Sequence, residues 1–104
     1  MTAVLKRPQF LLDLAEELTY LNEKAGANVA ARWYDALMAT IEELKHQPFL
    51  GRERDELTPK NVRTWRVKGF PRWLIFYQAR EDGALIFLRV RYGTMNLPML
   101  ELES

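Results

Sequence analysis

The chain has 104 residues, of which 48% are hydrophobic and 12% aromatic, so it can build the core of one small domain and has no room for two. The absence of cysteine excludes a disulfide framework, a thiolate metal site and a cysteine nucleophile, and the single histidine, His46, excludes a multi-histidine metal site. No apolar run reaches the roughly 20 residues that span a bilayer, and no signal-peptide pattern is present, so we expect one cytoplasmic domain over residues 1–104 that does not contact a membrane.

The first predicted elements are a short strand over residues 3–7 and an amphipathic helix over 8–25. Pro8 suits the first turn of this helix. N–H groups in the first turn have no intrahelical acceptor, so the N–H that proline lacks costs no hydrogen bond. Apolar residues then recur at helical spacing, with acidic residues mostly between them. Gly26 is expected to end the helix.

A second helix is predicted over residues 28–47, with Asn28 as its N-cap. Its apolar residues step by four, four, four and three, which places them on one face. Pro48 stops it. The short connection to the first helix predicts an antiparallel helical hairpin.

The second half of the chain has the pattern of a β-meander. Residues 48–61 contain two prolines, one glycine and many charges, which is typical of a surface loop. Three strands are predicted, over residues 62–67, 73–78 and 85–90. Turns are expected at 68–72 and at Glu81-Asp82-Gly83. Residues 95–104 are interpreted as a C-terminal tail.

This order of elements predicts an α+β fold, β-α-α-β-β-β, in which the helical hairpin packs on one face of a mainly antiparallel sheet. We expect the following residues to be buried between the two layers: Leu14, Leu18, Trp33, Leu37, Ile41, Ile75, Ile86 and Leu88. Strict alternation in the last strand places Leu85, Phe87, Arg89 and Arg91 on one face, and Ile86, Leu88, Val90 and Tyr92 on the other. The open, partly basic sheet face is a candidate functional surface.

Charge is unevenly distributed, although the net charge is only +1. Residues 1–44 carry 4 basic and 7 acidic side chains, residues 45–72 carry 8 and 3, and residues 73–104 carry 3 and 4. The basic middle segment could bind an anionic partner, such as nucleic acid or an acidic peptide. The alternative is a solvated loop and strand edge.

Few side chains are placed for catalysis, and no metal or cofactor is expected. No glycine motif forms a phosphate-binding loop, and adjacent helical carboxylates do not converge on one substrate.

The aromatic residues Trp65 and Trp73 could stack on a base or pack in the core. Metal-free RNA cleavage is chemically possible with Arg66, Arg89 and Tyr92. However, arginine stays protonated near neutrality and a tyrosine with a pKa near 10 is a weak base.

The motifs together resemble the ParE branch of the RelE/ParE toxin superfamily over about residues 3–94. The segments that carry the resemblance are AEELTYL, PFLGRERDEL, VRTWRV, WLIFYQ and IFLRVRYG. The most specific residues are Pro48, Gly51, Arg52, Glu56 and Leu57 of the loop, Val62 and Arg63 at the start of a strand, and Arg89, Val90, Tyr92 and Gly93 at the end of the last strand.

The resemblance implies a RelE/ParE-like fold and the toxin of a type II toxin–antitoxin module, of the kind that stabilises plasmids and arrests growth. It implies a ParD-like antitoxin partner with a ribbon-helix-helix DNA-binding domain, so that DNA is contacted only indirectly. ParE-like toxins are associated with inhibition of DNA gyrase, whereas RelE-like toxins cleave mRNA in the ribosome. Because no Tyr or His follows Tyr92, we favour a toxin that binds a protein target, with the ribosome-dependent endoribonuclease as the alternative. The residues expected to contact the antitoxin or the target are Arg52, Arg63, Trp65, Arg66, Trp73, Arg89, Arg91 and Tyr92.

Overall fold

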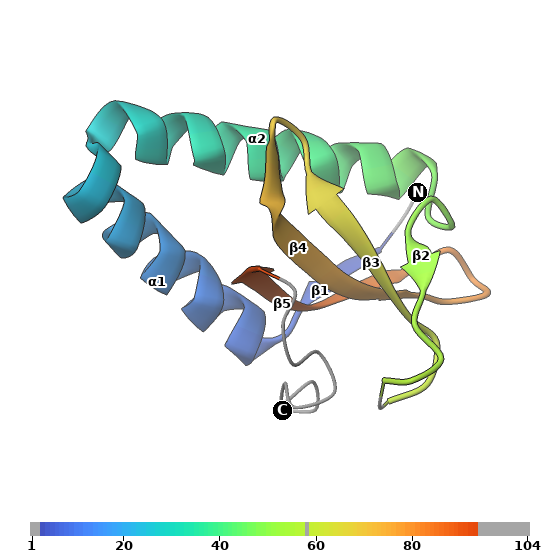
Figure 1. Ribbon diagram of the computed structural model, residues 1–104. Coiled ribbons are helices and arrows are strands. Elements are labelled where there is room, and N and C mark those ends of the chain that lie inside the picture. The colour runs from blue at the N-terminus through green and yellow to red at the C-terminus, as the bar shows by residue number, and fades with distance from the viewer. Residues whose placement is uncertain (1–2, 58, 94–104) are drawn as a thin grey trace.

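The computed structural model describes residues 3–57 and 59–93, and Figure 1 shows their arrangement as two helices and a five-stranded sheet. The elements are β1 (Val4–Lys6), α1 (Pro8–Ala25), α2 (Ala27–His46), β2 (Arg52–Glu53), β3 (Val62–Val67), β4 (Phe70–Ala79) and β5 (Leu85–Tyr92). The predicted α+β fold is confirmed. The predicted tail, 95–104, lies outside the described residues. None of the described helices is both long and apolar enough to cross a membrane.

A single glycine connects the two helices. Pro8 occupies the first turn of α1, as predicted, and Gly26 ends it with a positive φ of 96°. The same Gly26 is also the residue before the first turn of α2, so the helices diverge from it like the arms of a V (Figure 1). The prediction of Asn28 as an N-cap is therefore wrong, because α2 already begins at Ala27 and Asn28 lies inside it.

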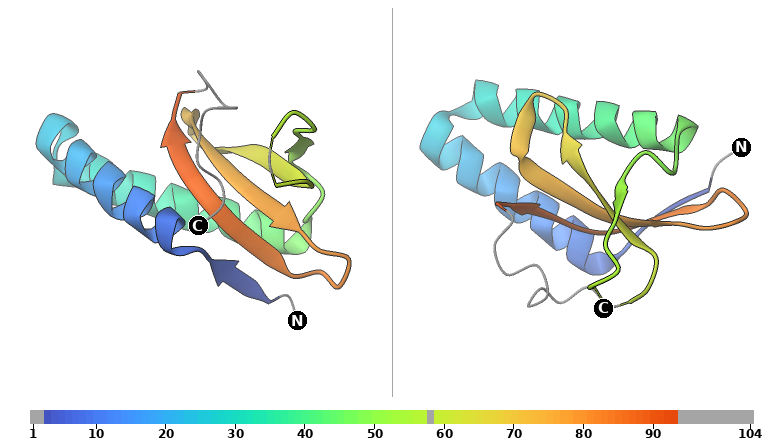
Figure 2. Two further views of the ribbon diagram at one scale, coloured as in Figure 1. Left: turned by 90° about the horizontal axis from the view of Figure 1, so that it is seen from below. Right: turned by 45° about the vertical axis from the view of Figure 1, so that its right-hand side comes forward.

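The sheet has the strand order β1-β5-β4-β3-β2. β1 pairs in parallel with β5, and the other neighbours pair antiparallel, which agrees with a mainly antiparallel sheet. Figure 2 shows β1 beside β5 at one edge and the two helices on one side of the sheet. The opposite edge is formed by β2 and by the part of β3 that extends beyond it.

Two strand predictions need correction. β4 begins at Phe70, three residues before the predicted start, because the turn after β3 is shorter than the predicted 68–72 turn. The predicted loop 48–61 contains β2, which pairs with β3 through Arg52 and Glu53. A strand of two exposed, charged residues has no apolar alternation, so its sequence carries no strand signal.

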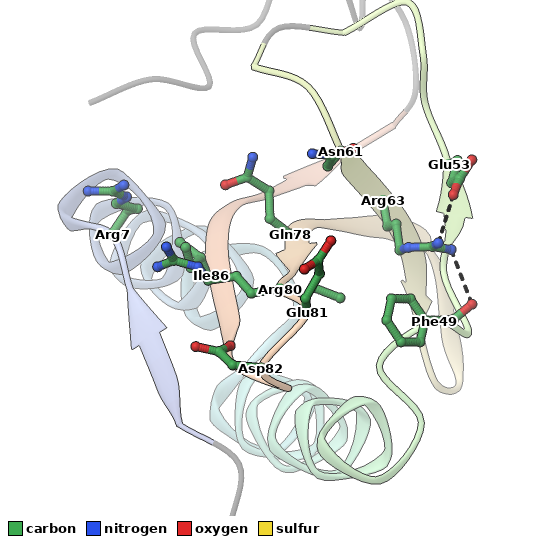
Figure 3. Close-up of a pocket in the computed structure, with 11 residues that line it drawn as sticks. Arg7, Phe49, Glu53, Asn61, Arg63, Gln78, Arg80, Glu81, Asp82 and Ile86 are labelled. Carbon is green, nitrogen blue, oxygen red and sulfur yellow. Dashed lines mark hydrogen bonds and ion pairs between the residues drawn. The ribbon is translucent and has the colours of Figure 1, made fainter.

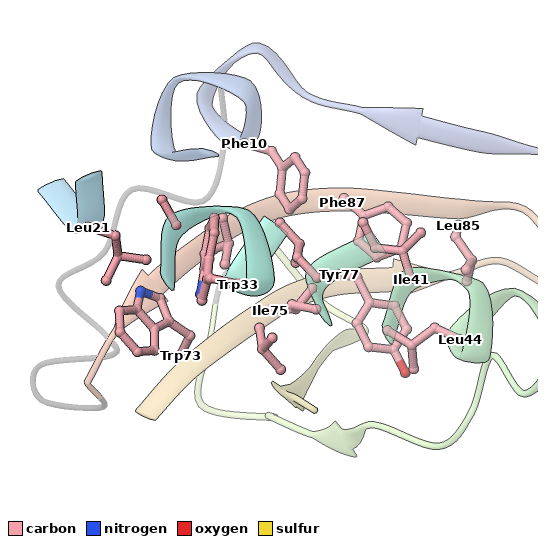
Figure 4. Packing of buried hydrophobic residues seen from close by; sticks show 14 residues of the cluster. Phe10, Leu21, Trp33, Ile41, Leu44, Trp73, Ile75, Tyr77, Leu85 and Phe87 are labelled. Carbon is pink, nitrogen blue, oxygen red and sulfur yellow. The ribbon is translucent and has the colours of Figure 1, made fainter. Parts of the chain in front are cut away.

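The main core lies between the helices and the sheet. Trp33, Leu37, Ile41 and Ile75 are buried in it as predicted, and the half-buried Leu14 and Leu18 pack against its border. Figure 4 shows side chains of this cluster from both layers meeting, including Trp33 and Ile41 of α2 and Ile75 and Tyr77 of β4. Most of its members are large aliphatic or aromatic residues, so their burial supplies the main stabilisation of the fold.

A second apolar cluster lies on the other face of the sheet. Its members are Leu57, Val62, Leu74, Phe76, Ile86 and Leu88. Ile86 and Leu88 are buried as predicted, but in this cluster and not between the layers. Leu57, from the predicted surface loop, is also buried here.

The strict alternation predicted for β5 is also wrong after Phe87. Tyr77 pairs with Phe87 but Phe76 pairs with Arg89, so Leu88 is an extra residue that forms a bulge. Beyond the bulge, Val90 returns to the main core beside Ile75. The bulge thus changes which side of the sheet each residue at the C-terminal end of β5 faces.

Candidate interaction surface

Four basic side chains surround one open pocket beside β2, β3 and the turn into β4. Arg52 and Arg54 come from β2 and the residue after it, and Arg66 and Lys68 come from the end of β3. The pocket has a volume of about 540 Å³, and its wall also contains Glu43, Thr64, Trp65, Val67, Gly69, Pro71 and Leu74. We call this region the basic pocket. It combines positive charge with an apolar wall.

Three of these cations have no carboxylate partner within the described residues. Arg54 donates to the Thr64 hydroxyl at 2.8 Å and lies 3.9 Å from the Glu56 carboxylate. Among the described residues, the Arg66 guanidinium donates to the main-chain carbonyl of Pro71, at 2.5 Å. For 3–57 and 59–93, no ion pair occurs at Arg52, Arg66 or Lys68. The basic pocket therefore retains net positive charge that an anionic partner could neutralise.

Arg63, by contrast, holds the loop that precedes β2. Its guanidinium donates to the carbonyls of Gly51 and Phe49 at 2.7 and 3.2 Å and to the Glu53 carboxylate at 2.8 Å. It also lies over the Phe49 ring, 5.0 Å from the centroid. Figure 3 shows Arg63 between Glu53 and Phe49 at the side of a second pocket, whose wall carries both signs of charge. Arg63 is thus largely occupied by contacts within the chain.

The buried Tyr77 hydroxyl binds the loop motif that contains Pro48 and Gly51. The Gly51 N–H donates to the buried Tyr77 hydroxyl at 2.9 Å, and this hydroxyl donates to the Pro48 carbonyl at 2.8 Å. A Cβ atom on Gly51 would lie 2.5 Å from the Tyr77 hydroxyl oxygen, so only glycine fits. Burial raises the pKa of Tyr77 above its usual value, although the Gly51 hydrogen bond and Arg63 act in the opposite direction.

Trp65 and Trp73 both face the helices. The Trp73 indole donates to Glu17 at 2.5 Å and packs against Trp33, with ring centroids 6.0 Å apart. The Trp65 indole donates to Glu43 of α2 at 3.4 Å, and its ring is half-buried. Figure 4 shows Trp73 packed beside Trp33 in the core. Trp73 is therefore a packing residue in this structure, whereas Trp65 also reaches the basic pocket.

Arg89 is buried against Asp13, a residue that the sequence analysis did not single out. The Arg89 guanidinium donates to the two carboxylate oxygens at 2.6 and 3.1 Å, and the Val90 N–H donates to the same carboxylate at 3.2 Å. Asp13 is fully buried and Arg89 is 7% exposed. Asp13 follows the buried Phe10 by three residues, and this spacing on one helix face was the signal that could have identified it.

The residues expected for RNA cleavage do not converge. Arg66 is in register with Leu74, which belongs to the cluster on the face away from the helices. Tyr92 is in register with Trp73 of the main core and packs edge-on against it, with centroids 4.8 Å apart. Paired residues of neighbouring strands share a face, so Arg66 and Tyr92 lie on opposite faces of the sheet. The third candidate, Arg89, is engaged by Asp13.

The remaining predicted contact residue, Arg91, lies beside Asp13 and Glu16 at the start of α1. Its guanidinium is 3.5 Å from the Asp13 carboxylate and 3.9 Å from that of Glu16. The structure therefore separates the predicted contact residues into two groups and one further residue, Arg63. Arg52, Trp65 and Arg66 share the basic pocket, whereas Trp73, Arg89, Arg91 and Tyr92 lie along α1 and β5, and Arg63 lies between β2 and the second pocket.

A comparison with protein-family models identifies the family of this chain. The model that describes the ParE toxin of the type II toxin–antitoxin system, parDE, matches residues 4–97, which is most of the chain. The chain belongs to the ParE toxin family. The partner of a toxin in such a system is an antitoxin, so this protein is the toxin component of a two-protein module.

Solved structures support the ParE fold. One of those that match is a chain of the chromosomal ParDE toxin–antitoxin system from P. aeruginosa, with a TM-score of 0.73 and 15% sequence identity. The match covers 90% of this chain and 98% of the other. The search of curated proteins gives no match.

Proposed function

We propose that this ParE-family toxin arrests growth in the cytoplasm by binding a protein target, DNA gyrase, and that it does not cleave RNA. The gyrase assignment follows from the association of ParE-like toxins with gyrase inhibition. The neutralising partner is a ParD-like antitoxin with a ribbon-helix-helix domain, and DNA is contacted only through that domain.

The observation that carries the choice of binding over cleavage is the separation of Arg66, Arg89 and Tyr92. Cleavage without a metal needs a base, an acid and a cation that meet at one phosphate. Here Arg66 and Tyr92 lie on opposite faces of the sheet, and the Arg89 guanidinium is bound to a fully buried carboxylate. This arrangement supports a protein that presents charged surfaces and argues against an assembled nuclease site.

The basic pocket supports an acidic peptide as the neutralising ligand. Arg52, Arg66 and Lys68 offer positive charge without ion-pair partners among the described residues, and Leu74 and Val67 offer apolar contact. An amphipathic, acidic antitoxin segment complements both properties. Such a segment would be disordered alone and would order when it binds.

Two assays with the purified toxin test the proposal. We expect the toxin to block supercoiling by gyrase, and we expect no cleavage of a reporter mRNA in a translation extract when its 5′ ends are mapped by primer extension. The matched variants are Tyr92→Phe and Arg66→Ala. Discrete cuts within codons that these variants abolish would overturn the proposal and establish the endoribonuclease.

The antitoxin part has its own test. Co-expression of the toxin with the product of the neighbouring reading frame should relieve growth arrest and yield a stable complex on pull-down. Continued arrest, with no complex, would contradict the assignment of that product as the antitoxin.

A further inference from the structure

Three aromatic rings meet where the sheet lies beside the middle of α1. Trp73 is at their centre: the Phe70 ring lies 6.0 Å from it and the Tyr92 ring 4.8 Å from it, measured between centroids, and both pairs pack edge-on. Tyr92 is in register with Trp73, so the two share the helix-facing side of the sheet. Trp73 is only 9% exposed, whereas Tyr92 is 55% exposed. The cluster therefore offers the Tyr92 ring to a ligand and buries the indole that supports it.

A carboxylate of α1 is held against the same indole. The Trp73 Nε1–H donates to Glu17 Oε1 at 2.5 Å. Within the described part of the chain, Glu17 makes no ion pair and its second carboxylate oxygen has no hydrogen-bond partner. The neighbouring cation, Arg91, lies 3.5 Å from the Asp13 carboxylate and 3.9 Å from that of Glu16. Glu17 thus keeps a negative charge whose position is fixed by an aromatic residue.

A carboxylate beside an exposed aromatic ring favours an organic cation as ligand. The face of a ring attracts a cation within about 6 Å of its centroid, and a carboxylate adds a charge-assisted hydrogen bond. Because Glu17 and Tyr92 both contact the Trp73 indole, one long side chain can reach the two of them. A guanidinium suits this pair better than an ammonium, since its plane can stack on the Tyr92 ring while its N–H groups donate to Glu17.

Other ligand classes fit this place less well. An anion would be repelled by Glu17. A metal ion needs several ligands that converge, and the described residues contain no group of three or more His, Cys, Asp or Glu side chains that could hold one. The basic pocket also has the opposite charge, and its Arg66 and Leu74 lie in register on the other face of the sheet. The two surfaces therefore select ligands of different charge.

We infer that Glu17, Trp73 and Tyr92 form a binding site for an arginine side chain of the toxin's protein target, and we call it the arginine site. The inference rests on the proposed function only for the source of the arginine. The antitoxin segment proposed above is acidic, so a cation at this second surface is better supplied by the target.

The first test uses the wild-type toxin and a probe of a single residue. Acetyl-arginine amide is titrated into isotope-labelled toxin, and NMR follows the indole N–H resonances of the three tryptophans. The Trp73 resonance should shift and saturate because its N–H is bound to Glu17, whereas that of Trp65, beside the basic pocket, should stay. Acetyl-citrulline amide has the same shape without the charge, and it should shift neither.

Variants then separate the charge from the ring. Glu17→Gln keeps an oxygen that can accept the Trp73 N–H but removes the charge, and it should weaken binding of the arginine probe roughly two- to fivefold. Tyr92→Leu should weaken it by a similar, roughly two- to fivefold factor, and Tyr92→Phe should restore most of the loss because it restores the ring. Glu23→Gln, at an exposed carboxylate of α1 outside the site, is the matched control and should bind like the wild type.

The source of the arginine is tested with the same variants in the supercoiling assay. Glu17→Gln and Tyr92→Leu should inhibit gyrase less than the wild type does, and Glu23→Gln should inhibit it equally. Weaker binding of the probe together with undiminished inhibition would overturn the target as the source. Loss of the complex with co-expressed antitoxin in those variants would assign the arginine to the antitoxin instead.

The site itself can be overturned without reference to gyrase. An absent or unsaturable shift of the Trp73 resonance, or an equal shift with the citrulline probe, would show that no arginine site exists. Failure of the wild-type toxin to inhibit gyrase would overturn the proposed function, while the NMR titration would still decide whether the site binds arginine.

Discussion

Arg89 and Arg52 are both arginines that the sequence predicts to contact a partner, but they lie in different surroundings and therefore have different roles. Arg89 lies at the junction of α1 and β5, where the buried Asp13 accepts two hydrogen bonds from it. Arg52 lies in the open basic pocket and has no ion-pair partner among the described residues. A buried, paired charge holds two elements in one arrangement, whereas an open, unpaired charge remains available to a ligand.

The Asp13 carboxylate also explains why α1 sits where it does. Beyond Phe87, β1 no longer pairs with β5, and the Asp13 carboxylate takes the Val90 N–H that a neighbouring strand would have bound. Asp13 therefore replaces a strand partner at that edge and binds Arg89 at the same time. This region is expected to be sensitive to substitution, and the basic pocket is expected to tolerate it.

The largest effect should come from breaking the buried pair. Asp13→Ala leaves the Arg89 guanidinium and the Val90 N–H without their acceptor, which should lower the free energy of unfolding by about 3–5 kcal/mol. Urea unfolding followed by circular dichroism measures the change. Glu16→Ala, at an exposed position one turn along α1, should change it by less than about 0.5 kcal/mol. Equal effects of the two substitutions would contradict a structural role for the pair.

A smaller effect is expected at Tyr77, whose hydroxyl binds the loop that contains Pro48 and Gly51. Tyr77→Phe leaves the Gly51 N–H and the Pro48 carbonyl without the hydroxyl, which should cost about 1–3 kcal/mol. Tyr20→Phe, at an exposed tyrosine, is the matched control and should be nearly neutral. A neutral Tyr77→Phe would show that water satisfies both groups.

The same residue should make stability depend on alkaline pH. Because burial raises the pKa of Tyr77 in the folded state above 10.0, the folded protein holds this proton more tightly than the unfolded chain does. The stabilisation is therefore fully present below pH 10 and is lost as pH rises through the folded-state pKa. The difference in unfolding free energy between wild type and Tyr77→Phe should shrink over that range, and a constant difference would contradict the assignment.

The smallest effect on stability, with a large effect on binding, is expected for the basic pocket. Arg52→Ala combined with Arg66→Ala should change the free energy of unfolding by less than about 1 kcal/mol, since neither side chain has an ion-pair partner among the described residues. The double variant should still arrest growth. Co-expressed antitoxin should rescue growth less well than it does with the wild-type toxin. Arg72→Ala is the control for charge alone. Full rescue of the double variant would place the antitoxin contact elsewhere.

Much of the fold follows from local patterns. Pro8 and Gly26 mark the two ends of α1, and the four-residue steps from Trp33 to Ile41 place the core face of α2, because these signals act within a turn or two of one helix. β3 was predicted at its observed bounds. Features without a local signal were missed, above all β2, whose two charged residues form a strand only because β3 lies beside them.

The sequence by itself determined the order of the elements, the family and the concentration of positive charge in the middle of the chain. Tertiary structure alone decided which charges stay available. Asp13 and Arg89 are separated by 76 positions, so no short-range pattern shows that they neutralise each other. The bulge at Leu88 likewise depends on the pairing of β5 with β4, and it moves Val90 to the helix side. Whether an arginine supports the fold or faces a partner depends on what distant residues bring to it, because charge interactions are set by distance in space and by burial.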